Sequence, residues 1–409
     1  MRHPELLIPA GSLEVLKIAV VFGADAVYIG GEEFGLRAKA KNFSLKEMEE
    51  GIAFAHAHGA KVYVTANIFA HNEDLAEVGR YFEELKQIKP DALIISDPGV
   101  YRIAKEVCPE IERHISTQAN NTNYGTFLFW HAQGAKRVVS ARELSLAEIK
   151  EIRNRIPDDM EIETFIHGAM CISYSGRCLL SNYLTGRDAN QGACTHPCRW
   201  KYSIVEETRP HEYMPVFENE RGTYIFNSKD LCMIEHIPEL MEAGIDSFKI
   251  EGRMKTALYV ATVSRTYRKA IDDYMESPDI YLKNLPWYVS QISNCTYRQF
   301  TTGFFFGKPS QEAQIYDNNT YLKEYTYLGL VEACIREGVC AISQRNKFSV
   351  GEEIEVMKPN GENTAAVVRS IWDEDGNEME SAPHPQQKLS VDLGVPVERY
   401  DILRRKEEE

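Results

Sequence analysis

Short apolar runs alternate with amphipathic stretches through the first 255 residues of the chain. Eight of these runs end in a polar or glycine-containing tip, and they cover residues 6–8, 26–29, 62–64, 92–95, 114–115, 137–139, 163–166 and 247–250. Helical patterns lie between them, and the clearest cover residues 13–21, 45–58, 73–87 and 146–155. Strict alternation of strands and helices predicts a parallel sheet, because parallel strands need a crossover connection.

Glycine marks the step from helix to strand in several of these units. A tripeptide that begins with glycine precedes the strand at Gly23-Ala24-Asp25, Gly59-Ala60-Lys61, Gly134-Ala135-Lys136 and Gly244-Ile245-Asp246. A glycine directly after a helix supplies the left-handed C-cap, and a strand then begins within a few residues. About eight such units in roughly 250 residues predict a closed (β/α)8 TIM-like barrel, with an open doubly wound sheet as the alternative.

Polar side chains follow most of the predicted strands. In a barrel the carboxyl ends of the strands meet at one mouth, where active sites are found. Taken singly, each of these residues is more readily explained as structural, but together they predict a polar pocket. The residues are Asn67, Asp97, Gln118, Arg142, His167, Glu251 and Arg253.

Five of the nine cysteines are clustered in one region of the chain. They are Cys171, Cys178, Cys194 and Cys198, spaced C-x6-C-x15-C-x3-C, followed by Cys232. No apolar run follows a basic N-terminus, so we expect no secretory signal and a cytoplasmic protein, where structural disulfides are rare. The spacing lacks the paired knuckles of structural zinc and favours an iron–sulfur cluster, with zinc as the alternative. We expect the other cysteines, at 108, 295, 334 and 340, to be small buried hydrophobic residues.

The domain organisation follows from changes in pattern. We expect a barrel domain at residues 1–285, with the long connection at about 169–246 folded as an insertion over the barrel mouth and containing a further strand at 224–226. A linker region at 286–324 then leads to residues 325–405, where short strands alternate with turn signals. This tail predicts a small antiparallel β-barrel.

Charge and hydropathy exclude some classes of function. The formal net charge of -15 argues against broad, non-specific nucleic-acid binding, although basic groups at 199–201 and 404–406 could act locally. No segment reaches about 18 uninterrupted apolar residues, so we expect no membrane span.

Several blocks of the sequence resemble a known family. The block ETFIHGAMCISYSGRCLLSNYLTGRDANQGACTHPCRW is similar to the signature of the collagenase-like peptidase family U32. The blocks LLIPAGSLEVLKIAVVFGADAVYIGG, STQANNTN, NSKDL and SFKIEGRMK resemble it too, and the similarity continues into the C-terminal β module. Within the family the chain is most similar to members that act in prephenate-dependent, oxygen-independent tRNA hydroxylation.

The resemblance implies a cofactor, substrates and a partner. It implies a 4Fe-4S cluster held by Cys171, Cys178 and Cys194, with either Cys198 or Cys232 as the fourth ligand. It also implies tRNA as the substrate, with the wobble uridine converted to 5-hydroxyuridine, and prephenate as the hydroxyl donor. Related chains often occur as paired paralogues, so a paralogous subunit is an expected partner.

The same resemblance gives roles to the polar residues. Prephenate carries two carboxylates, so its site needs cations, and the candidates are Arg37, Arg142, Lys229, Lys249 and Arg253. Asn67 and Gln118 complete the substrate-binding candidates, and the catalytic candidates are His167, Glu251 and Lys229.

Two other functions stay open at this point. The family name implies a peptidase, but the chain contains neither a G-x-S-x-G nor an H-E-x-x-H motif. The third hypothesis is a non-catalytic scaffold whose β module binds RNA or protein.

Overall fold

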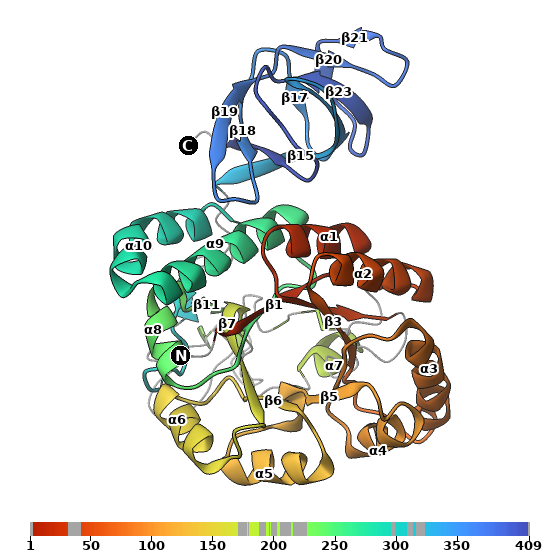
Figure 1. Cartoon of the computed structure of the whole chain (residues 1–409), viewed down its shortest axis with the longest axis vertical. Coiled ribbons are helices and arrows are strands. Elements are labelled where there is room, and N and C mark those ends of the chain that lie inside the picture. The colour runs from red at the N-terminus through yellow and green to blue at the C-terminus, as the bar shows by residue number, and fades with distance from the viewer. Residues whose placement is uncertain are drawn as a thin grey trace. The chain divides into compact units, whose positions relative to one another are not determined.

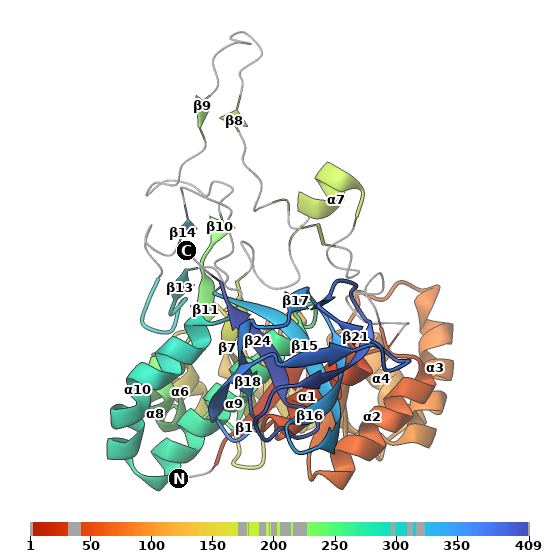
Figure 2. The same ribbon diagram turned by 90° about the horizontal axis from the view of Figure 1, so that it is seen from above.

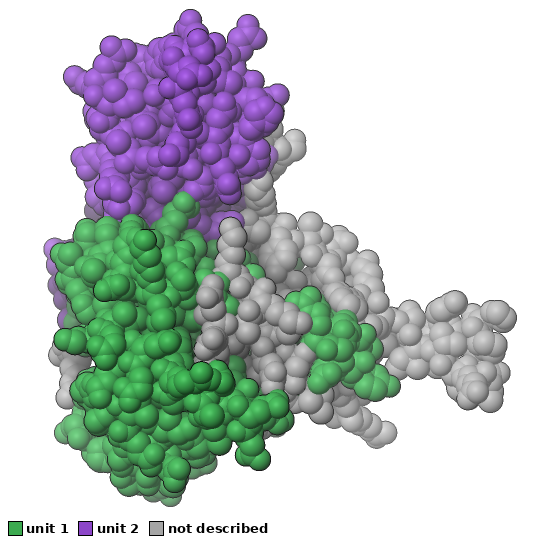
Figure 3. Space-filling model, turned by 90° about the vertical axis from the view of Figure 1, so that its right-hand side faces the viewer, with its two compact units in different colours: residues 1–17, 25–255, 298–320 green, residues 18–24, 256–297, 321–409 purple. Residues whose placement is uncertain are grey.

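The computed structural model describes most of the chain. The described residues are 3–31, 42–170, 178, 180–187, 194–195, 197, 203–204, 214–215, 227–295, 299–308, 314–315 and 324–407. They form two compact units, shown in different colours in Figure 3. The first unit comprises residues 1–17, 25–255 and 298–320, and the second comprises residues 18–24, 256–297 and 321–409.

The first unit is built on a closed ring of parallel strands (Figure 1). In ring order the strands are β1 (Glu5–Pro9), β2 (Ala26–Gly30), β3 (Lys61–Ala66), β4 (Ala92–Ile95), β5 (Glu112–Ile115), β6 (Arg137–Val139), β7 (Glu161–Ala169) and β12 (Ser247–Ile250). The ring closes because β12 pairs in parallel with both β7 and β1. The predicted TIM-like barrel is therefore confirmed, and the open doubly wound sheet is wrong.

The connections between the strands are helical, as the alternation predicts. They are α1 (Leu13–Val21), α2 (Leu45–Ala57), α3 (Asp74–Ile88), α4 (Pro98–Val107), α5 (Tyr124–Gln133) and α6 (Leu146–Arg155). Ser44 and Ser145 begin α2 and α6 with complete capping boxes, in which each side chain exchanges hydrogen bonds with a glutamate three residues later. Gly134 ends α5 in the left-handed conformation, at φ 90°, which a side chain would strain.

Further elements lie at the end of the barrel where the strands finish. Strand β11 (Asp230–Cys232) pairs antiparallel with β7, and β13 (Phe300–Thr301) pairs in parallel with β11. Helix α7 (Leu180–Thr185) falls inside the ring in Figure 1 and beyond one end of it in Figure 2, so it lies over the barrel mouth. This position agrees with the expected insertion over the mouth.

The rest of the 169–246 connection consists of short elements. They are β8 (Ser203–Ile204), β9 (Met214–Pro215), β10 (Asn227–Ser228), the 3-10 turn Ile234–His236 and α8 (Ile237–Glu242), which leads into β12. Strand β10 pairs with β14 (Gln314–Ile315). The strand expected at 224–226 lies outside the described residues.

The structure differs from the predicted linker at 286–324. Helix α10 (Pro278–Ser293) continues through Pro286, which the sequence reading took as the end of the helical region. Further along, Phe305 is buried and its carbonyl oxygen accepts a hydrogen bond from the Leu146 amide at 3.0 Å. The described residues of this region are therefore packed structure.

The second unit contains α9 (Ala257–Glu276), α10 and an antiparallel sheet. In spatial order the strands of the sheet are β19 (Asn363–Val367), β18 (Glu353–Met357), β24 (Ile402–Lys406), β15 (Tyr325–Arg336), β16 (Val339–Gln344), β23 (Lys388–Asp392), β20 (Ser370–Trp372) and β21 (Glu378–Met379). A small pair, β17 (Phe348–Ser349) with β22 (Ser381–Ala382), packs against the same core. The predicted antiparallel β module is confirmed, and because β19 and β21 do not pair within residues 324–407 it is a half-barrel.

Two details of the second unit correct the sequence reading. Arg404, assigned to a local basic patch, is fully buried, and its Nε donates to Glu355 Oε1 at 2.6 Å. Arg405 pairs with Glu352. Cys334, expected to be buried, is exposed because the last residues of β15 leave the core, whereas Cys108, Cys295 and Cys340 are buried as predicted.

Candidate functional site

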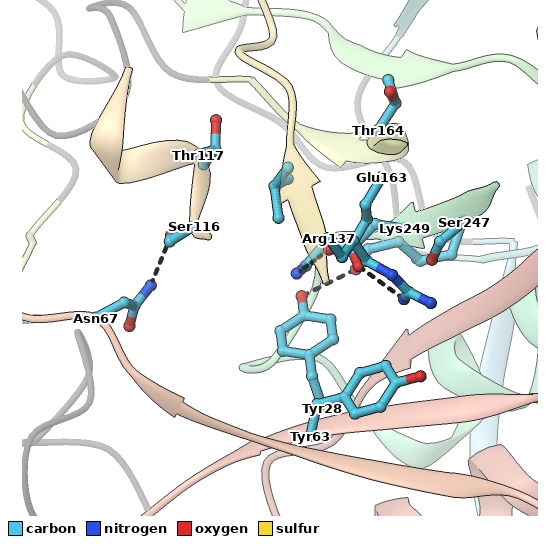
Figure 4. A network of polar contacts seen from close by, with 12 residues as sticks. Tyr28, Tyr63, Asn67, Ser116, Thr117, Arg137, Glu163, Thr164, Ser247 and Lys249 are labelled. Carbon is cyan, nitrogen blue, oxygen red and sulfur yellow. Dashed lines mark hydrogen bonds and ion pairs between the residues drawn. The ribbon is translucent and has the colours of Figure 1, made fainter. Parts of the chain in front are cut away.

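A network of buried charges fills the barrel interior below the mouth (Figure 4). Arg137 contacts Glu5 at 2.5 Å, Glu163 at 3.1 Å and Glu161 at 2.7 Å. Lys249 Nζ donates to Glu163 Oε1 at 2.6 Å and lies 4.5 Å from the centre of the Tyr28 ring. Each cation of the network has a carboxylate partner on another strand, so the network holds strands β1, β6, β7 and β12 together.

The charges of the network stay ionised despite their burial. Burial opposes ionisation of Glu5, but the charge of Arg137 and hydrogen bonds from Arg137 and Tyr63 lower its pKa to about 2. Burial also opposes ionisation of Glu163, and here Lys249 and Arg137 outweigh it, so the pKa is lowered. His114 behaves differently, because burial and the charge of Arg137 lower its pKa and keep the imidazole neutral.

Arg142 and Glu251 form an ion pair at the mouth, from the ends of β6 and β12. Arg142 Nη2 donates to Glu251 Oε2 at 3.1 Å, and Arg142 Nη1 donates to the Ala169 carbonyl at 2.9 Å. The guanidinium carbon lies 4.0 Å from the centre of the Phe165 ring, a cation–π contact that fixes its plane. The structure thus brings together two of the predicted site residues.

Gly168 makes the close approach of β7 to Glu251 achievable. Its φ is +107°, and a Cβ built on it would lie 2.7 Å from the Glu251 carbonyl oxygen. The Glu251 amide donates to the His167 carbonyl at 2.9 Å across the same contact. Any side chain at position 168 would therefore displace Glu251.

The side chain of Arg253 lies beside the ends of β2 and β3. Its Nη1 donates to Thr65 Oγ1 at 3.1 Å, and its Nη2 donates to Asn42 Oδ1 at 3.2 Å. A Cβ on Gly30 would lie 2.1 Å from Nη2, so glycine at that position leaves the room that the guanidinium occupies. Arg253 is buried, and its charge is held at the rim of the barrel interior.

The ends of β3, β4 and β5 carry further polar side chains. Asn67 follows β3, and its Nδ2 donates to Ser116 Oγ at 3.2 Å. Ser96, after β4, donates to the Asn67 carbonyl at 3.1 Å. Gln118 lies in the 3-10 turn Thr117–Ala119 that follows β5. Sequence reasoning found Asn67 and Gln118 but missed the serines, because a single serine at a strand end carries little signal.

His167 and Cys232 face each other across the antiparallel pair of β7 and β11, as register partners. His167 is buried, and burial together with the positive charge of Lys255 lowers its pKa to about 3. The imidazole is therefore neutral at neutral pH. Sequence reasoning missed Lys255, the last residue of the block SFKIEGRMK, because it lies past the strand tip that ends at Arg253.

Two other cysteines are joined through α7. Cys178 precedes the helix, and Cys194 precedes Thr195, whose amide donates to Ser181 Oγ at 3.0 Å. Thr195 Oγ1 also lies 3.2 Å from Thr185 Oγ1. Because Ser181 and Thr185 belong to α7, these hydrogen bonds hold the segments of Cys178 and Cys194 near one helix. Cys194 is exposed, whereas Cys178 and Cys232 are half-buried.

The remaining predicted site residues fall into two groups. Cys171, Cys198 and Arg37 lie outside the described residues. Asp97 has a structural task, since its Oδ1 accepts from the Val100 amide at 2.9 Å as the N-cap of α4. Lys229 is half-buried between β10 and β11. Within the described ranges, no group of three or more His, Cys, Asp or Glu side chains is arranged to hold a metal ion.

Two family models cover almost the whole chain. The model for peptidase family U32 matches residues 11–315, and the model for the peptidase family U32 C-terminal domain matches residues 323–404. The chain belongs to peptidase family U32. The first match covers the barrel from the end of β1 onward, with its mouth, and the second coincides with the antiparallel sheet. In the part of the chain that the structure describes, no helix is long and apolar enough to cross a membrane.

Members of family U32 that are similar to this chain include named RNA-modifying proteins. The tRNA hydroxylation protein P1 of Bacillus subtilis is 43% identical, over 99% of this chain and 95% of its own. The tRNA hydroxylation protein P of Escherichia coli is 39% identical, over 99% of this chain and 97% of its own. A 23S rRNA 5-hydroxycytidine synthase of Escherichia coli is 39% identical, over 66% of this chain and 40% of its own.

Proposed function

We propose that this U32 protein is an enzyme that hydroxylates a pyrimidine base of tRNA. The similarity over 99% of the chain to two tRNA hydroxylation proteins supports an RNA substrate. The observation that carries the proposal is the group at the barrel mouth, where Arg142, Glu251 and Arg253 lie on strand ends beside the β7–β11 pair that holds His167 and Cys232. A mouth of this kind offers cations, a carboxylate and a thiol to one small substrate.

The finer proposal is that the wobble uridine becomes 5-hydroxyuridine with prephenate as the hydroxyl donor. Prephenate has two carboxylates, and guanidinium groups are the side chains best shaped to bind them. Arg142 and Arg253 are both held in fixed orientations at the mouth. Glu251, ion-paired with Arg142, is the candidate to accept a proton from the base, because its carboxylate lies at the mouth.

We further propose a 4Fe-4S cluster as the cofactor. The donor set fits, because thiolates are the usual ligands of such a cluster and the hydrogen bonds of α7 with Thr195 hold the segments of Cys178 and Cys194 together. Cys171, Cys178 and Cys194 would be three ligands, and Cys232 is favoured over Cys198 as the fourth by its place beside His167 on the mouth strands. Such a cluster, when bound, supplies an electron-transfer and Lewis-acid centre. His167, being neutral, would serve as a hydrogen-bonding group there rather than as an acid.

The cofactor is tested by purifying the protein without oxygen and measuring iron and sulfide. We expect about four of each per chain, as in other Cys-ligated cubane clusters. Cys171→Ala and Cys232→Ala should lose most of the iron, whereas Cys334→Ala, which removes an exposed thiol of the second unit, should keep it. Loss of iron in Cys198→Ala but not in Cys232→Ala would reverse the choice of fourth ligand. Zinc, or no metal in a folded sample, would overturn the cluster.

The reaction is tested in a bacterial strain that lacks its own tRNA hydroxylation proteins. The wild-type chain should restore 5-hydroxyuridine in tRNA, as measured by mass spectrometry of the nucleosides, and the Cys171→Ala variant should not. Peptide cleavage that survives removal of iron would favour the peptidase. Restoration by Cys171→Ala would favour a scaffold that assists another enzyme. A paralogous partner subunit stays a prediction, to be tested by co-purification.

A further inference from the structure

Three side-chain amide oxygens lie at or beneath the ends of β3 and β5. Asn67 Oδ1, Gln118 Oε1 and Asn121 Oδ1 are buried, and each accepts no hydrogen bond from the residues that the structure describes. Asn121 itself is fully buried. A buried acceptor without a donor is destabilising, so the oxygens of Asn67 and Gln118, which both lie beside Ser116, point to a ligand that supplies a donor.

The three oxygens belong to the arc of the ring opposite the charged pair. In the ring order β4 is four places from β12, so the ends of β3, β4 and β5 face the end that carries Glu251. In Figure 4, Asn67 and Ser116 lie across the barrel interior from Arg137, Glu163 and Lys249. We call the ends of β3 and β5, with Asn67, Ser116 and Gln118, the neutral half of the mouth, and the Arg253 guanidinium lies beside it at Thr65.

The neutral half is held in place by its own hydrogen bonds. Asn67 Nδ2 donates a hydrogen bond to Ser116 Oγ at 3.2 Å, so Asn67 Oδ1 can accept one from a ligand. Asn121 Nδ2 donates to the carbonyls of Ser116 at 2.9 Å and Val139 at 2.8 Å. Thr117 Oγ1 donates to the Ser140 carbonyl at 3.1 Å and ties down the turn that carries Gln118. The oxygens are thus oriented before any ligand arrives.

The chemistry of this half selects a neutral ligand. Amide oxygens repel carboxylates, because both are acceptors, so a dicarboxylate donor would be held by the guanidinium groups of Arg142 and Arg253 rather than by these oxygens. The ligand at these oxygens must present an N–H group. Uracil has an N3–H flanked by two carbonyl oxygens, and a glutamine side chain offers an acceptor and a donor at matching spacing.

We propose that Asn67 and Gln118 form a base-reading subsite that accepts a hydrogen bond from the N3–H edge of uracil. This inference rests on the proposed function and names the half of the mouth that holds the base. Cytosine carries an acceptor at N3, which would oppose the oxygen of Asn67. RNA-modifying enzymes reach such a position by taking the base out of its stack.

Binding of two RNAs tests the subsite. One is a stem-loop RNA with a single loop uridine, and the other carries 3-methyluridine at that position, which lacks the N–H. We expect the methyl group to weaken binding to the wild-type protein about fivefold to tenfold, the effect of one lost hydrogen bond. Gln118→Met should weaken binding of the uridine RNA similarly and reduce the difference between the two RNAs, because the two changes remove one interaction.

The matched control is Gln133→Met, which removes an exposed glutamine side chain at the end of α5. This variant should distinguish the two RNAs as well as the wild type does. Gln118→Glu keeps an acceptor and should still distinguish the uridine RNA from the 3-methyluridine RNA. That result would show that a substitution at position 118 does not by itself unfold the site. If Gln118→Met discriminates as well as the wild type, the subsite is wrong even though the proposed function stands. If Gln118→Met instead loses affinity for prephenate, the neutral half binds the donor and the inference is overturned. If wild-type protein binds neither RNA and forms no 5-hydroxyuridine, the proposed function fails first.

Discussion

Lys249 Nζ lies 2.6 Å from Glu163 Oε1 in the barrel interior, and this contact joins β12 to β7 where the ring closes. Both side chains are almost completely buried. Lys249 was expected to bind substrate, but its ammonium already has a carboxylate partner. Arg142 and Arg253 are the predicted substrate-binding cations that the structure places at the mouth.

Breaking this buried pair should destabilise the protein strongly. Glu163→Gln removes the partner of Lys249 and one partner of Arg137, and it leaves buried positive charge uncompensated. We expect the free energy of unfolding to fall by about 3–5 kcal/mol, measured by urea denaturation at neutral pH. Glu50→Gln, which removes one half of the exposed Lys17–Glu50 pair, should cost less than about 1 kcal/mol. Equal losses in the two variants would contradict the role assigned to the network.

Acidification should weaken the protein partly through His114. Burial, with the charge of Arg137, lowers the pKa of His114 below its ordinary value of 6.5. Below about pH 6.5 the unfolded chain therefore binds a proton that the folded chain does not, so the free energy of unfolding falls as the pH falls. His114→Phe keeps a ring against Tyr63, which His114 contacts edge-on at 4.7 Å, and removes the titrating group.

The variant should lose less stability than the wild type between about pH 6.5 and pH 5, as measured by denaturant titrations at several pH values. Parallel curves for the two proteins would show that His114 is not a source of the pH dependence.

Alanine at position 168 should strain the backbone and should also displace Glu251 at the mouth. Gly168→Ala places a Cβ 2.7 Å from the Glu251 carbonyl oxygen and holds a non-glycine residue at φ +107°. Gly59→Ala isolates the strain alone, because Gly59 has φ +78° and nothing within 4 Å of its Cβ position. We expect a cost of roughly 1–2 kcal/mol at position 59, from the left-handed conformation.

At position 168 we expect a larger cost together with loss of tRNA hydroxylation. Thermal unfolding and nucleoside analysis of tRNA measure the two effects. A Gly168→Ala protein with full activity would remove Glu251 from the proposed mechanism.

The basic residues near the C-terminus should contribute little to RNA binding. Arg405 pairs with Glu352, and Arg404 is buried against Glu355, so neither presents a free charge. We expect Arg405→Gln to change the affinity for tRNA by less than about twofold, because a paired exposed charge adds little. A steep loss of affinity, with a reduced dependence on salt concentration, would instead identify a phosphate contact.

The barrel could be predicted from sequence because its signals are local. Each strand is an apolar run, and each helix has its own start and stop residues, such as Ser145 before α6 and Gly134 after α5. These interactions join residues a few positions apart, so they leave a pattern along the chain. The closure of the ring then follows from repetition, since each βα unit packs in the same sense as the previous one.

Strand β24 shows why other parts were missed. Its sequence, ILRRK, reads as a solvated basic end, yet it lies between β18 and β15 in the centre of the half-barrel. Arg404 is tolerated there because Glu355, on the neighbouring strand, supplies the opposite charge. Glu355 is 49 residues away from Arg404 in sequence, so no local pattern predicts the pair.

The same division applies to the mouth. The sequence by itself determined the fold class, the family resemblance and most of the polar residues at the strand ends, because these depend on periodicity and on short motifs. Only the tertiary structure decided which groups meet: Arg142 with Glu251, Lys249 with Glu163, and His167 with Cys232. The members of each pair come from different strands, so the register of the barrel decides which side chains meet. Burial then favours contacts in which a buried charge has an opposite charge beside it, whatever the distance between the two residues along the chain.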